Sequence, residues 1–236
     1  MIPLALSAVC VNLLQLVNVT GVSLTPKGPH MARFTLLAPL TLLGCTAIGA
    51  LVPAHAEQVS SAYTSAAGKD CRTLSGREVD TDDEASEQLC RGPAGLVVLK
   101  NETDLRETVT VGRNAEEAGR QLAAAQGFGP FNSTTDTIEW RLGGNGKPFA
   151  MIQRWHIADN GDLDAKGRPR NEQMLVVTRL PPGAACHVAY IDVKANADAN
   201  ALARKAADQL ARGFDCGNDK VAIICHSGRA VELAKR

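Results

Sequence analysis

The chain has 236 residues, which is enough for one domain or at most two small ones. All 25 acidic residues follow Ala56, whereas two of the 25 basic ones, Lys27 and Arg33, precede it, which leaves 23 basic against 25 acidic groups in residues 57–236. The resulting net charge of −2 creates no basic field for nucleic acid or an anionic membrane surface, so neither is an expected partner.

Residues 31–56 contain the three parts of a secretory signal peptide in the correct order. Met31-Ala32-Arg33 is a basic start, residues 34–52 are an apolar run, and Ala54-His55-Ala56 is an A-x-A cleavage site followed by the charged Glu57. The sequence therefore predicts cleavage near Ala56 and export to the periplasm or the medium.

The stretch before Met31 has a different character. Residues 1–30 are apolar, but Asn12, Gln15 and Asn18 interrupt the run and no basic residue precedes it. We interpret residues 1–30 as an upstream extension that arises from a start codon assigned too early. A signal anchor or a tandem apolar leader is the alternative.

A lipid anchor is a further alternative at this end of the chain. Leu42-Leu43-Gly44-Cys45 resembles a bacterial lipobox, which would make Cys45 a lipidated amino terminus. Residues 46–53 stay apolar up to the A-x-A site instead of becoming a polar tether, so the cleavable signal is favoured. After residue 57 no apolar run approaches the ~18 residues of a transmembrane helix.

Five cysteines follow the signal, and in an exported protein they are first expected to form disulfides. Their grouping predicts the pairs Cys71–Cys90 and Cys186–Cys216, each worth roughly 3 kcal/mol in the chain-entropy model. The connectivity stays open, since Cys225 can replace Cys216, and one cysteine is left over in either case. No C-x-x-C motif occurs, so neither a zinc ribbon nor a thioredoxin-type site is indicated.

Residues 57–92 are rich in Ser, Thr, Asp, Glu and Gly, with an acidic run at Asp80–Glu84. This composition predicts a loosely ordered polar arm tethered by the first disulfide. From residue 93 the pattern becomes regular, so residues 93–236 are expected to form the folded domain.

Alternation and turn signals predict strands in this domain. Residues 137–142 alternate apolar with polar side chains, and the following Gly143-Gly144-Asn145-Gly146 is a strong turn. The loop over residues 158–172 is polar. The expected strands cover residues 96–99, 108–111, 137–142, 148–157, 174–180 and 186–193, with a short last strand over 221–225.

Two helices are expected between these strands and after them. Asn114 is placed as an N-cap with Glu117 three residues on, and this helix ends at Gly127. The second helix covers residues 197–212, is capped by Asn196 and has an apolar side chain at every fourth position. Short connections favour antiparallel pairing. The sequence therefore predicts an α+β domain, an antiparallel β-sheet with two helices packed on one face, stapled by disulfides.

Several runs in this domain carry a resemblance. They are Asp104-Leu105-Arg106, Thr137-Ile138-Glu139-Trp140-Arg141, Pro148-Phe149-Ala150 and Arg154-Trp155. Through them the chain resembles a group of uncharacterised exported alphaproteobacterial proteins over most of residues 63–216. The resemblance implies export, and it brings no activity, cofactor or site residue.

The sharpest catalytic lead is Cys225 beside His226, because an imidazole can activate a neighbouring thiol as a nucleophile. Adjacent residues on a strand, however, point to opposite faces, and Cys225 follows the apolar run Val221–Ile224. A buried or disulfide-bonded cysteine is therefore favoured over a cysteine-dependent enzyme that uses Cys225 with a histidine.

Asn160, Asp162 and Asp164 have the 1, 3, 5 spacing of a calcium loop. Ala165 stands where such a loop needs Gly, and Asn171 where it needs Glu. A solvated hairpin loop is therefore favoured over a calcium site, and a calcium-dependent envelope protein remains an alternative. No cofactor is predicted.

Four charged residues, Glu139, Arg141, Arg154 and Arg179, are expected on the polar face of the sheet. They can form a cross-strand ladder of ion pairs or a recognition surface for an acidic ligand or partner, and the ladder is favoured. Because the sequence contains no recognisable catalytic motif, it favours an exported, non-enzymatic binding or structural module. Its expected partner is a protein or an envelope component.

Overall fold

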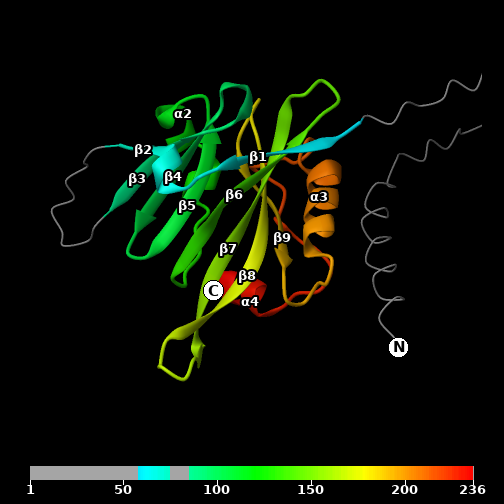
Figure 1. Ribbon diagram of the computed structural model, residues 1–236. Helices are drawn as coiled ribbons and strands as arrows, with labels where there is room; N and C mark the ends of the chain where they lie inside the picture. Colours follow the sequence, from blue (N-terminus) through cyan, green and yellow to red (C-terminus); the bar gives the residue numbers. More distant parts are fainter. Residues whose placement is uncertain (1–57, 75–84, 236) are drawn as a thin grey trace, which may run out of the picture.

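The computed structural model describes residues 58–74 and 85–235 and shows a mixed α+β fold (Figure 1). In this part of the chain ten strands form a six-stranded and a four-stranded sheet, accompanied by three short α-helices. The predicted α+β class is confirmed. The signal peptide, Cys45 and the extension before Met31 lie outside the described residues.

The larger sheet has the strand order β1-β6-β7-β8-β9-β10. All neighbours pair antiparallel except β9 and β10, which are parallel. The strands are β1 (Ser60–Ser65), β6 (Asn132–Leu142), β7 (Pro148–Leu163), β8 (Pro169–Arg179), β9 (Cys186–Asp192) and β10 (Ala222–Ile223).

The smaller sheet is fully antiparallel with the order β2-β3-β4-β5, formed by Cys71–Thr73, Ser86–Arg91, Val97–Thr103 and Arg106–Gly112. Residues 57–92, expected as a loosely ordered arm, thus contribute three strands. β1 and β2 lie at sheet edges, where few apolar side chains are needed, so their polar composition does not reveal them. The acidic run at Asp80–Glu84 falls among residues 75–84, outside the described part.

The main core lies between the two sheets. Trp140 and Trp155 of the larger sheet are almost fully buried and pack with Val98 and Val111 of the smaller one. The Trp140 Nε1–H donates to Thr64 Oγ1 at 2.8 Å, which satisfies its polar atom and holds β1 in place.

The helices cover different faces. Helix α3 (Ala199–Leu210) packs its buried alanines and Leu202 on one face of the larger sheet, against side chains such as Val177 and Ile191. Helix α4 (Arg229–Ala234) joins the main core on the other face, and α2 (Ala115–Gly119) lies against β5. The two helices expected on one face correspond to α2 and α3, but α2 packs on the smaller sheet and α3 on the larger one. The unpredicted α4 covers the other face of the larger sheet, because β7 and β8 are apolar on both faces.

Local capping agrees in part with the sequence. Asn114 Oδ1 accepts from the backbone N–H of Glu117 at 2.8 Å, as predicted, but α2 ends at Gly119 and a 3₁₀ turn, Leu122–Ala125, replaces the rest of the expected helix. The N-cap of α3 is Asp198. Asn196, predicted for that role, is instead buried and bonds the backbone of Asp192 and His226.

Both predicted disulfides are present. Cys71–Cys90 links β2 to β3, and Cys186–Cys216 links the start of β9 to the segment after α3. The second bond spans 30 residues and so constrains the whole β9–α3 connection.

Candidate functional site

Strands β7 and β8 are longer than their neighbours and project from the sheet as a two-stranded arm, residues 158–172. β6 pairs with β7 as far as Ile157, and β9 pairs with β8 as far as Met174. Beyond these points the arm strands pair with each other: Ala158 is opposite Asn171, Asp159 is opposite Arg170, and Leu163 is opposite Pro169. Figure 1 shows the arm extending beyond both sheets at the bottom of the view. The sequence indicated a loop here because apolar alternation stops after Ile157.

One edge of the arm is open for backbone hydrogen bonding at Asn171. Ala158 donates its N–H to Phe131 O, away from β8, so the opposite residue Asn171 must direct its own N–H and C=O away from β7. On the same edge the Val193 N–H donates to Gln173 O at 3.0 Å, and among residues 58–74 and 85–235 it is the last backbone contact from the β9 side. Next to this contact, the backbone of Asn171 faces outward.

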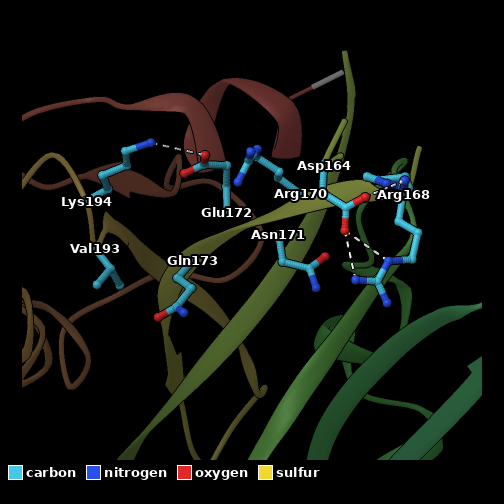
Figure 2. Close-up of a pocket in the computed structure, with 9 residues that line it drawn as sticks. Asp164, Arg168, Arg170, Asn171, Glu172, Gln173, Val193 and Lys194 are labelled. Atoms are coloured by element: carbon cyan, nitrogen blue, oxygen red, sulfur yellow. Dashed lines mark hydrogen bonds and ion pairs between the residues drawn. The ribbon is translucent and has the colours of Figure 1, made fainter. Parts of the chain in front are cut away.

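A groove of about 750 Å³ follows this open edge (Figure 2). Asn171 and Gln173 present side-chain amides along it, and Val193 and Lys194 form its other wall. Pro169, which has no N–H, marks the outer end of the edge. The groove is thus lined by hydrogen-bonding groups beside one strand residue whose backbone N–H and C=O face outward, a combination suited to a ligand that itself carries a polypeptide backbone.

The charged side chains of the groove neutralise one another. Arg168 holds Asp164 through both Nε and NH2, at 3.0 and 2.8 Å, and Lys194 Nζ lies 3.4 Å from Glu172 Oε1. Hydrogen bonds from the backbone and then the side chain of Arg168 lower the pKa of Asp164. Asp164 therefore stays ionised and paired, which suits a fixed polar wall rather than a proton donor.

Glu139 and Arg141 were predicted to form a ladder along the sheet. They do approach each other, with 3.9 Å between Arg141 NH1 and Glu139 Oε1, but their shorter bonds reach helix α3. Arg141 forms a bidentate pair with Asp208 at 2.8 Å for both bonds, and Glu139 accepts from Arg204 Nε at 2.6 Å. Ser61 of β1 bonds to both residues, so this cluster ties β1, β6 and α3 together.

The other two residues of that predicted set have different partners. Arg154 donates to Gln173 Oε1 at 2.7 Å and to Asn200 Oδ1 at 3.4 Å, next to the start of α3. Arg179 lies at the end of β8, level with Arg141 across β7, and donates to the backbone carbonyls of Pro182 and Ala184. Each of the four charges thus bonds a partner within the fold, and they form no continuous ladder of ion pairs among themselves.

The residues with calcium-loop spacing lie on the arm. Asp162 pairs with Arg170, with 3.3 Å between Asp162 Oδ1 and Arg170 Nε, and Asp164 pairs with Arg168, while Asn160 is exposed. No group of three or more His, Cys, Asp or Glu side chains within the described residues has the arrangement of a metal site.

Cys225 lies two residues after β10, its side chain is half-buried, and its backbone has a positive φ of 62°. His226 is exposed, and its backbone carbonyl and N–H bond the side chain of Asn196. These contacts place the Cys225–His226 pair in the segment that leads into α4.

No family model, curated protein or solved structure matches the chain. No helix in residues 58–74 or 85–235 combines the length and apolarity required to cross a bilayer. Sequence reasoning missed Asn171, Gln173 and Lys194 as site residues, because an open strand edge depends on where the neighbouring strand ends.

Proposed function

We propose that the protein is an exported binding module that captures an extended polypeptide segment of a partner protein along the open edge of β8. The observation that carries the proposal is the outward-facing backbone of Asn171 beside the groove. Strand addition supplies main-chain hydrogen bonds, while side-chain pockets select the sequence. The amides of Asn171 and Gln173 and the paired charges around them are suited to a polar segment.

The substitution Asn171→Pro distinguishes strand addition from binding through side chains alone. Asn171→Pro removes the outward N–H without breaking a bond to β7, because the Asn171–Ala158 pair is not hydrogen-bonded, so folding is retained. Asn171→Ala keeps the backbone and removes only the amide. We expect the proline variant to lose the partner and the alanine variant to keep most of the affinity.

The measurement is photocrosslinking in intact envelopes, with the photoreactive residue at Lys194 in the groove wall and, as a control, at Glu116 on α2. A polypeptide adduct is expected from position 194 only, absent with Asn171→Pro and present with Asn171→Ala. Adducts that survive the proline substitution, or that form equally from position 116, contradict strand addition.

Export by cleavage near Ala56 is part of the same proposal. Two disulfides support an oxidising compartment, where such bonds persist. Intact-mass spectrometry of protein from its native envelope is expected to give a chain that begins at Glu57 with both disulfides formed. A chain that keeps residues 1–56 contradicts export by cleavage, and a lipid mass on Cys45 establishes the lipoprotein alternative instead.

A further inference from the structure

A second cavity lies at the opposite end of the larger sheet from the arm. It has a volume of about 320 Å³, within the range of small-molecule sites. Its walls come from the β6–β7 turn, the start of β7, the end of β8, the Pro181–Pro182 segment and the end of α3. It shares no residue with the groove of Figure 2.

The charged residues that line this second cavity, called the cleft below, are all cations. Lys147, Arg179 and Arg212 line it, and no Asp or Glu does. Within the described chain neither Lys147 nor Arg179 forms an ion pair, in contrast to the groove on the arm, where the cations pair with carboxylates. Lys147 and Arg179, with no carboxylate partner in the described chain, concentrate positive potential in this small concave space.

Arg179 is held in place by the backbone. Its NH1 donates to Ala184 O at 2.5 Å and its NH2 to Pro182 O at 3.1 Å, while Nε is buried and has no acceptor within the described residues. A Cβ on Gly183, where φ is +89°, would approach the guanidinium to 3.1 Å. A fixed guanidinium with an unsatisfied buried N–H is costly, and a nearby anion offsets that cost.

The remaining walls are apolar. The guanidinium carbon of Arg212 lies 4.0 Å from the centroid of the Phe149 ring, and Leu180, Pro181 and Pro182 complete the surface. Stacking on the ring fixes the Arg212 cation at the rim of the cleft. Cations and apolar surface thus lie within one small cavity.

We propose that this cleft binds a small organic anion. Its carboxylate or phosphate head is held by Arg179 and Lys147, and its apolar body lies on Phe149 and the two prolines. The site is independent of the partner-binding edge of β8, because the two cavities have no residue in common. The protein thereby joins a protein-binding edge to a small-anion site at opposite ends of one sheet.

Nuclear magnetic resonance titration of the mature, disulfide-bonded protein tests this site with three probes: benzoate, phenyl phosphate and the neutral benzyl alcohol. Saturable shifts are expected at the Arg179 Nε–H and at the backbone amides of Phe149 and Leu180 with an anion, weakening as salt is added. Benzyl alcohol is expected to leave these resonances unchanged. A stronger response to benzoate or to phenyl phosphate identifies the head group.

Lys147→Gln removes an exposed cation of the cleft and is expected to weaken anion binding about threefold or more. Lys166→Gln, an exposed lysine on the arm, is the matched control and is expected to leave binding unchanged. Arg179→Gln is expected to abolish binding, and the lysine pair preserves the test should Arg179→Gln unfold the protein. Equal binding of benzyl alcohol, equal effects of the two lysine substitutions, or no saturable anion response overturns the proposal.

Discussion

His187→Phe is expected to reduce the acid sensitivity of the fold. His187 is 1% exposed, and its ring lies among the rings of Phe128, Trp155 and Tyr190, with Nδ1 at 2.9 Å from the Tyr190 hydroxyl. Burial lowers the pKa of His187 from 6.5 to about 3. The same burial raises the pKa of Tyr190 to about 12, so neither ring is charged near neutral pH.

The direction of the effect follows from proton binding. Below pH 6.5 His187 is protonated in the unfolded chain, whereas in the folded protein it stays unprotonated until the pH approaches about 3. Stability that is present above pH 6.5 is therefore lost as the pH falls, by about 1.4 kcal/mol for each pH unit. Between pH 7.5 and pH 5 this single group is expected to cost about 2 kcal/mol.

Urea denaturation of the disulfide-bonded protein at the two pH values measures this difference. His187→Phe loses the hydrogen bond to Tyr190 and is expected to be less stable at pH 7.5, but its free energy of unfolding should fall about 2 kcal/mol less on acidification. His226→Gln, which replaces an exposed histidine and keeps the buried His187, serves as the control. An unchanged pH dependence in His187→Phe contradicts the role of the buried ring.

The features predicted correctly from the sequence are those that depend on nearby residues or on a general rule. The pair Cys71–Cys90 follows from compartment and grouping, and the cap at Asn114 from three neighbouring residues. The strand over 137–142 follows from alternation, although β6 begins earlier, at Asn132. Each of these features depends on residues close together in the chain or on a rule that holds for a whole class of proteins.

The sequence did not predict features that depend on contacts between residues far apart in the chain. Tyr63 and Ser61 belong to a strand only because β1 pairs with β6, some 80 residues later. Glu139 and Arg141 resemble a surface ladder in the sequence, yet the alanine-rich face of α3 brings Arg204 and Asp208 down onto them. The open edge at Asn171 likewise depends on where β9 ends, which no pattern within the arm records.

The charge cluster of Glu139, Arg141, Arg204 and Asp208 gives the second large expected effect on stability. Arg141→Met is expected to lower the free energy of unfolding by about 2–3 kcal/mol, because removal of one partner leaves a partly buried charge uncompensated. The Arg141 side chain is 9% exposed and that of Asp208 29%, so Asp208 cannot regain full hydration by itself. Arg120→Met, at an exposed i,i+4 pair with Glu116, is the matched control and is expected to change stability by less than about 0.5 kcal/mol.

The double variant Arg141→Met, Asp208→Leu distinguishes charge from packing. With both charges gone no uncompensated ion remains, and apolar side chains can fill the contact between β6 and α3, so at least half of the lost stability is expected to return. Both variants lose the contacts of Arg141 with Ser61 and Glu139, and both keep the bond of Glu139 to Arg204, so their difference isolates Asp208. A double variant as unstable as Arg141→Met would show that Arg141 acts through packing of its stem and its bond to Ser61, and that the pair with Asp208 does not fix α3 to the sheet.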